Sequence, residues 1–170
     1  MKARLLLALL LLTGLLGPAF AASPGEVVVG GLLREVNMQG LAGPSAKLAE
    51  FHGKPLIINV WASWCGPCQQ EMASLERLSS RFGGKQFAII GISTDDYPQA
   101  AQAALKKSGI KFRQFIDQQL VLENMLGAQH IPLTVLVNAQ GKVLLKIYGT
   151  REWDDARSLD LISKTLQVKL

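Results

Sequence analysis

Hydrophobic and polar positions follow one another along the chain in blocks that predict alternating strands and helices. Continuous apolar, β-branched runs at 55–62 and 86–93 are typical of strands buried on both faces. Between them, apolar residues recur at helical spacing from 65 to 84 and end at a Gly-Gly pair, which predicts a helix. Further helices are predicted at 95–109, 119–128 and 151–167, and further strands at 111–117, 131–138 and 142–149.

The ends of this pattern indicate how the strands pair. The last two predicted strands flank the turn Ala139–Gly141, which predicts an antiparallel hairpin. Weak alternation with glycine turn signals at 26–40 predicts one or two short strands at an antiparallel edge, and 45–51 gives one helical turn at most. We therefore expect an α/β sandwich around a mixed sheet, formed by a single domain over 22–170.

The first 21 residues have a different pattern. Lys2 and Arg4 precede an uncharged run at 5–16, and small residues at 19 and 21 form a cleavage pattern. This predicts a signal peptide over 1–21 that is cleaved after Ala21, and hence an exported, periplasmic protein. The competing interpretation is an uncleaved membrane anchor, because the run becomes marginal for the roughly 20 residues of a membrane span once 19–22 are added.

Composition excludes other classes. The 170-residue chain is 49% hydrophobic and 18% charged, which is typical of a globular domain. The formal net charge is +5, and it falls to +3 when the two basic residues of the leader are removed. No basic run follows the leader, so we expect no nucleic-acid partner.

Both cysteines of the chain, Cys65 and Cys68, lie in the stretch "WCGPC", where a buried strand ends and a helix begins. Free N–H groups and the helix dipole at this position favour a thiolate and predict a lowered pKa for Cys65. Pro67 suits the first helical turn. The pair therefore resembles an exposed attacking thiol, Cys65, and a more sheltered resolving thiol, Cys68.

Two cysteines at this spacing can also form a structural bridge or contribute to a metal site. A structural bridge across two residues constrains the unfolded chain little. A zinc or copper site needs further ligands, and the sequence offers His52 and His130 besides the thiols. Reversible thiol–disulfide exchange is therefore the favoured chemistry, with no metal and no cofactor beyond the cysteine pair.

The cysteine stretch and a proline motif later in the chain together resemble a known family. "WASWCGPC" together with "IPLT" resembles the thioredoxin superfamily. The longer stretch "GKPLIINVWASWCGPCQQEMASL" is similar to exported thiol–disulfide oxidoreductases of the TlpA/ResA type, relatives of the cytochrome c maturation thioredoxins. The resemblance covers 36–170. It implies a thioredoxin-like three-layer sandwich, with a mixed central sheet between helices, an N-terminal β-hairpin and an inserted helix and strand at 95–117.

The resemblance also implies roles for individual residues. Cys65 is the expected nucleophile and Cys68 the resolving thiol. Pro132 matches the cis-proline beside the active disulfide, and the peptide at Ile131 is expected to pair with a substrate strand. Trp64 is expected to cover the disulfide or to contact partners.

Proton transfer at the predicted site requires a titratable group near the cysteines. Thioredoxins often place a buried acid six residues before the first cysteine, and this chain has Asn59 there. A glutamate of the exported subgroup matches Glu71, which is therefore predicted to relay a proton or tune a thiol pKa; the alternative is an ordinary first-turn glutamate. The subgroup's usual proline is replaced by Ala73, which leaves the approach of Glu71 to the cysteines open. His130 either touches the site or faces solvent.

The resemblance favours a dedicated reductant of protein disulfides in the periplasm. Such a protein receives electrons from a membrane donor of the DsbD/CcdA type. A Cys-Gly-Pro-Cys pair is that of thioredoxin, which is reducing at about −270 mV. A disulfide-donating oxidant, a copper-handling module and a binding module with a vestigial cysteine pair are the alternatives. An isomerase is disfavoured, because the chain has no extra dimerisation domain, and we expect a monomer.

Overall fold

The computed structural model describes residues 23–170, so the predicted signal peptide lies outside the described residues. Seven strands form one sheet in the order β2-β1-β5-β4-β3-β6-β7. The strands are β1 (Asn37–Gly40), β2 (Ala46–Lys47), β3 (Leu56–Trp61), β4 (Ala88–Ser93), β5 (Arg113–Ile116), β6 (Leu133–Val137) and β7 (Val143–Tyr148). The helices are η1 (Leu48–Phe51), α1 (Gly66–Phe82), α2 (Pro98–Ser108), α3 (Val121–Leu126) and α4 (Ala156–Leu166).

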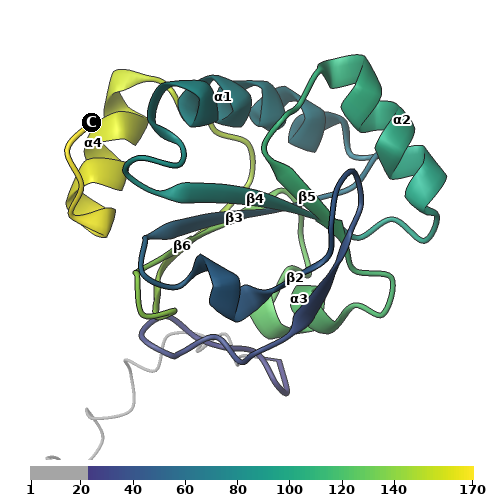
Figure 1. Cartoon of the computed structure of the whole chain (residues 1–170), viewed down its shortest axis with the longest axis horizontal. Coiled ribbons are helices and arrows are strands. Elements are labelled where there is room, and N and C mark those ends of the chain that lie inside the picture. Colours follow the sequence, from purple (N-terminus) through teal and green to yellow (C-terminus); the bar gives the residue numbers. More distant parts are fainter. Residues whose placement is uncertain (1–22) are drawn as a thin grey trace, which may run out of the picture.

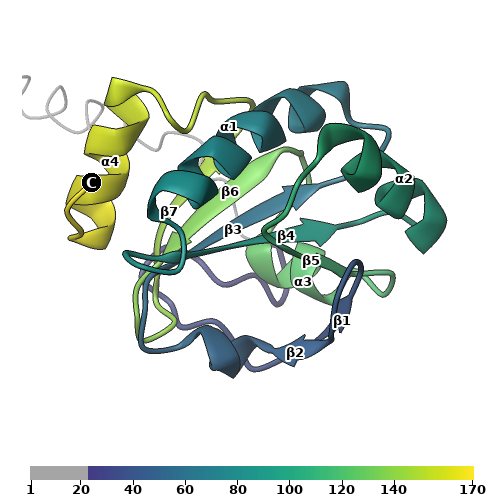
Figure 2. The same cartoon turned by 45° about the horizontal axis from the view of Figure 1, so that its top comes forward.

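The helices enclose the sheet from both sides. Helices α1, α2 and α4 cover one face, and α3 and the single turn η1 lie on the other (Figures 1 and 2). The predicted α/β three-layer sandwich with a mixed sheet is therefore confirmed. The β1–β2 pair forms the N-terminal hairpin, and α2 with β5 forms the inserted helix and strand.

Strand direction decides where the two halves of the site meet. The central strand β3 runs parallel to β4 and antiparallel to β6, with Val60 opposite Leu133. The end of β3 and the start of β6 therefore lie at the same edge of the sheet. This edge brings the turn that holds Cys65 to the peptide that precedes β6 at Pro132.

Side-chain alternation along β3 places a polar group under helix α1. Ile58 and Val60 point into the core on the α3 side, whereas Ile57 packs with residues of α1 on the opposite face. Because successive strand residues point to opposite faces, Asn59 points to the α1 side. All six residues of β3 are buried. This burial explains why the strand is apolar at every position except Asn59.

Two predicted elements are shorter than the sequence indicates. The weakly alternating stretch 26–40 contains a strand only at its end, β1, and Val27 is tied instead to α3 by its N–H, which donates to the Met125 carbonyl at 2.8 Å. The last helix begins at Ala156 instead of 151, because Asp155 caps it by accepting from the Ser158 N–H at 2.7 Å. Residues 151–154 thus form a separate segment that packs on α1.

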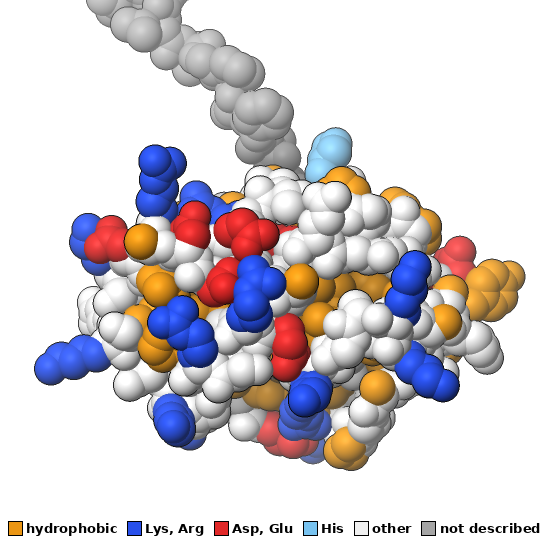
Figure 3. All heavy atoms as spheres, turned by 90° about the horizontal axis from the view of Figure 1, so that it is seen from above, with side chains coloured by type: hydrophobic (Ala, Val, Ile, Leu, Met, Phe, Trp, Pro, Cys, Tyr) orange, Lys and Arg blue, Asp and Glu red, His pale blue; other side chains and the backbone are white. Residues whose placement is uncertain are grey.

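The surface carries charges of both signs. On the face formed by α1, α2 and α4, positive and negative side chains are interspersed (Figure 3). No helix within residues 23–170 has the length and apolar character needed to cross a membrane.

Candidate active site

The two cysteines form a disulfide at the start of α1. Cys65 is the residue that caps the helix, and its Sγ accepts the backbone N–H of Cys68 at 3.2 Å. The two sulfurs are bonded at 1.98 Å. Cys65 is 6% exposed and Cys68 is fully buried, so the predicted difference in access exists, although Cys65 is more sheltered than the sequence indicates. An attacking thiol can therefore reach the disulfide only at Cys65.

A cis peptide bond lies against the disulfide. The bond between Ile131 and Pro132 is cis, as the resemblance implies. The Cys65 Sγ lies 4.0 Å from the Ile131 carbonyl oxygen. This contact leaves the backbone of the Ile131 peptide next to the sulfur that an incoming disulfide must approach. The substrate-pairing role of this peptide stays a prediction.

The turn that leads to Cys65 is fixed by a buried acid that the sequence analysis did not single out. Asp95, which follows β4, is 3% exposed. It accepts the Ser63 N–H at 2.9 Å and the Ser93 hydroxyl at 2.7 Å. Trp64, between Ser63 and Cys65, is 73% exposed and points away from the core. The signal in the sequence was an acidic residue shortly after a buried strand, but we interpreted this residue as the start of a helix.

Glu71 is fully buried behind the disulfide, on the helix that begins at Cys65. Because it follows Cys68 by three residues, both lie on one face of α1 about one turn apart. Its two carboxylate oxygens accept hydrogen bonds from Trp153 Nε1 at 2.6 Å and from Asn59 Nδ2 at 3.0 Å. The helix continues unbroken through Ala73, so the missing proline does not prevent the burial of Glu71.

Burial away from water raises the pKa of Glu71 from its ordinary value of 4.5 to about 7, and the hydrogen bonds from Trp153 and Asn59 lower it in part. The charge of Arg151 also lowers this pKa. A carboxyl group with a pKa near 7 exchanges its proton readily at neutral pH. The alternative interpretation was an ordinary first-turn glutamate, which would face water. Glu71 is instead fully buried.

The amide of Asn59 is matched to both protonation states of Glu71. Its Nδ2 donates to Glu71 and also to the Thr134 hydroxyl at 3.0 Å, while its Oδ1 is buried without a partner. Half a turn of the amide would direct Oδ1 at the same two oxygens. The Thr134 hydroxyl can always donate to it, and Glu71 can donate once protonated.

Trp153 is the residue in contact with Glu71 that the sequence pattern did not indicate. It was placed within the last amphipathic helix, but it lies in the segment before that helix and is fully buried against α1. By contrast His130, just before the cis bond, is exposed, and no hydrogen bond ties it to the cysteines within the described residues. Trp61, three residues before Trp64, is fully buried in the core.

Residues 23–170 contain no group of three or more His, Cys, Asp or Glu side chains placed to hold a metal ion. The site brings together two sulfurs, one buried carboxyl group and the backbone of a cis peptide. These groups can break and form disulfides and move the accompanying proton.

Comparison with known proteins agrees with this chemistry. The model of the Redoxin family matches residues 28–161. The thiol-disulfide oxidoreductase ResA of Bacillus thuringiensis (strain Al Hakam) is 28% identical over 145 residues, which cover 83% of this chain and 84% of the relative. ResA of Geobacillus thermodenitrificans is 27% identical over 138 residues, with 81% and 79% covered.

Solved structures share the fold. A thiol:disulfide interchange protein of the thioredoxin family from Chlorobium tepidum TLS superposes with a TM-score of 0.70 at 20% identity, over 81% of this chain and 97% of that one. StoA from Bacillus subtilis gives a TM-score of 0.63 at 18% identity, over 71% and 91%.

Fold and paired cysteines together define a thioredoxin-like thiol–disulfide oxidoreductase. The chain belongs to the Redoxin family, and within the thioredoxin superfamily it is of the ResA/TlpA type. The predicted superfamily is thereby confirmed.

The buried carboxyl group predicts a specific pH dependence of stability. Between pH 4.5 and about 7 the folded protein holds a proton on Glu71 that the unfolded chain releases. The free energy of unfolding is therefore expected to fall as pH rises through this range, by about 3 kcal/mol in all, and to level off above it. Urea unfolding of the oxidised protein between pH 4 and 9 measures this fall.

Glu71→Gln is the control, since glutamine is nearly the same size and has no proton to lose. The difference between the two unfolding free energies isolates Glu71 from every other titrating group. We expect the variant to gain on the natural protein as pH rises from 4.5 to about 7. Two parallel curves would show that Glu71 ionises at its ordinary pKa.

Proposed function

We propose that this thiol–disulfide oxidoreductase is an exported reductant, which transfers two electrons from the reduced Cys65–Cys68 pair to disulfides of partner proteins in the periplasm. One observation carries the proposal: a nearly buried cysteine pair lies beside the cis peptide at Pro132, with the fully buried Glu71 one helical turn behind it. The names of the ResA relatives support the reaction class.

The first step uses Cys65. Its thiolate is stabilised by the Cys68 N–H at the start of α1, and it attacks one sulfur of the substrate disulfide. The substrate S–S bond breaks, a mixed disulfide forms at Cys65, and the departing substrate sulfur leaves as a thiolate that takes a proton from water. The Ile131 peptide lies where it can hold the substrate backbone.

The second step uses Cys68 and Glu71. Cys68 attacks the Cys65 sulfur, so the mixed disulfide breaks, the Cys65–Cys68 bond forms and the second substrate thiolate leaves. The fully buried Cys68 thiol must lose its proton for this attack, and water has little access to it. Glu71, with a pKa of about 7, accepts that proton in its ionised form.

Charge at the site favours giving electrons over taking them. Ionised Glu71, one helical turn from Cys68, and the Ile131 carbonyl oxygen, 4.0 Å from the Cys65 Sγ, both oppose negative charge on the cysteine sulfurs and act against the stabilisation by the Cys68 N–H. A less stable thiolate makes the reduced pair a stronger reductant, in contrast to strong oxidants whose reduced form is stabilised. The Cys-Gly-Pro-Cys sequence, shared with reducing thioredoxin, supports the same direction.

Export and partners follow from the sequence pattern. The leader-like pattern at 1–21 supports a periplasmic location, with membrane anchoring as the alternative. A reductant in an oxidising compartment must itself be reduced, so we assign it a membrane electron donor of the DsbD/CcdA type. Its substrates are protein disulfides, and we assign its redox chemistry to the Cys65–Cys68 pair.

The roles of the two cysteines predict which variant traps substrate. Reduced Cys68→Ser is expected to attack insulin disulfides through Cys65 and to remain joined to insulin, because no thiol resolves the complex. Nonreducing electrophoresis and mass spectrometry detect this complex, which dithiothreitol should release.

Cys65→Ser is the matched variant, with the same atoms changed at the other sulfur. It should trap no insulin, since Cys68 is shielded from large substrates. Equal trapping by both variants would overturn the assignment. Failure of the natural protein to reduce insulin at all would overturn the proposed activity.

The proposed role as a reductant predicts a low reduction potential for the Cys65–Cys68 pair. Equilibration in glutathione or dithiothreitol buffers, followed by Trp fluorescence, should give a value below about −220 mV, toward the thioredoxin end of the scale. A value near −120 mV, the potential of a strong disulfide donor, would reverse the direction and leave the chemistry of the site unchanged.

A further inference from the structure

The buried carboxylate of Glu71 is held by a residue from the far end of the chain. Trp153 is fully buried, and its Nε1 donates to Glu71 Oε1 at 2.6 Å. This is the shortest hydrogen bond that Glu71 accepts, and it joins residues 82 positions apart in the sequence. A hydrogen bond to a charged acceptor in the interior strongly favours the charged form.

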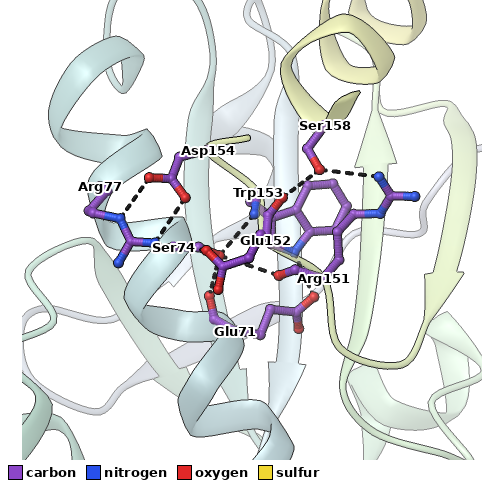
Figure 4. A network of polar contacts seen from close by, with 8 residues as sticks. All are labelled: Glu71, Ser74, Arg77, Arg151, Glu152, Trp153, Asp154 and Ser158. Carbon is purple, nitrogen blue, oxygen red and sulfur yellow. Dashed lines mark hydrogen bonds and ion pairs between the residues drawn. The ribbon is translucent and has the colours of Figure 1, made fainter. Parts of the chain in front are cut away.

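Several contacts fix Trp153 in this position (Figure 4). Its backbone N–H donates to the Ser74 hydroxyl of α1 at 2.9 Å. On either side of it, Glu152 and Asp154 both bind Arg77 of α1, at 2.8 and 2.6 Å. Segment 151–154 is thus bound to the same helix that positions Cys65 and Glu71, and the indole is fully buried against that helix.

Few charged groups act on Glu71 from the elements packed around it. Strand β3 presents Asn59 and strand β6 presents Thr134, neither of which titrates in the accessible range. Helix α1 presents the cysteine pair, and segment 151–154 presents Arg151, whose charge favours the carboxylate. Among these groups, Trp153 donates the shortest bond and can be altered without a change of charge.

We propose that Trp153 is a positioning residue of the redox site, whose indole N–H favours the carboxylate form of Glu71 and orients it as the proton acceptor for Cys68. This inference rests on the proposed function of Glu71 and goes beyond it. Without the N–H, a larger fraction of the buried carboxyl groups is protonated at neutral pH, so fewer of them can take a proton from Cys68. The segment before α4 therefore sets the pH range in which the second step of disulfide reduction works.

Direct titration of Glu71 tests this role. In protein labelled with carbon-13 at the glutamate side-chain carboxyl, the Glu71 signal is assigned by its loss in Glu71→Gln. Trp153→Phe removes the N–H and keeps an aromatic ring. The titration midpoint of Glu71 should rise by about one pH unit, a tenfold gain in proton affinity. The pH profile of insulin reduction should shift in the same direction.

Trp61→Phe is the matched control. Trp61 is also fully buried, and its Nε1 donates at 2.9 Å, but the acceptor is the neutral Gln114. This variant loses the same atoms from the core and should leave the Glu71 midpoint unchanged. In a Glu71→Gln background, Trp153→Phe should no longer move the pH profile, which a merely structural role would not predict.

If Trp153→Phe does not fold, β-(3-benzothienyl)alanine at 153 replaces the N–H by sulfur and keeps the bicyclic shape. An unchanged or lowered Glu71 midpoint in the folded variant would overturn the proposal. So would an equal shift in Trp61→Phe. Both outcomes leave the proposed reductase function intact, because insulin reduction and Cys68→Ser trapping test that function separately.

Discussion

One buried carboxylate constrains the arrangement of three distant parts of this chain. A charged group in the interior is costly unless hydrogen bonds replace water. Glu71 obtains these bonds from Asn59 on the central strand and from Trp153 just before the last helix. The sheet, helix α1 and the C-terminal segment must therefore keep a fixed relation, and the ion pairs of Arg77 with that segment support it.

The sulfur chemistry depends on a second constraint, the reversal of strand direction at the centre of the sheet. Because β6 runs antiparallel to β3, the cis peptide before β6 lies at the edge where Cys65 begins its helix. Asp95, two residues after the neighbouring β4, binds Ser63 in the turn between β3 and α1. The ends of β3 and β4 and the start of β6 thus position the disulfide together.

Local pattern explains why some of this could be predicted from the sequence. The buried strand before Cys65, the helix after it and the hairpin at 131–149 follow from periodicity and turn signals, and the spacing of the cysteines indicates their chemistry. The cis bond at Pro132 required the family resemblance. Trp153 could not be found, because its bond to Glu71 spans 82 positions and its neighbours have the pattern of an amphipathic helix. Asp155 caps the helix, so the helix begins at Ala156 and Trp153 lies in the segment before it.

In the proposed mechanism, the residues for recognition and for proton transfer lie in different parts of the site. Trp64 and the Ile131 peptide lie on the side that a partner protein can reach, whereas Glu71, Asn59 and Trp153 are fully buried. A partner can therefore influence proton transfer only through the disulfide and the helix that begins at Cys65. It follows that the surface around Trp64 can change with the substrate while the buried group keeps its pKa. Conversely, a change in the buried group alters the pH range of the reaction for every substrate alike.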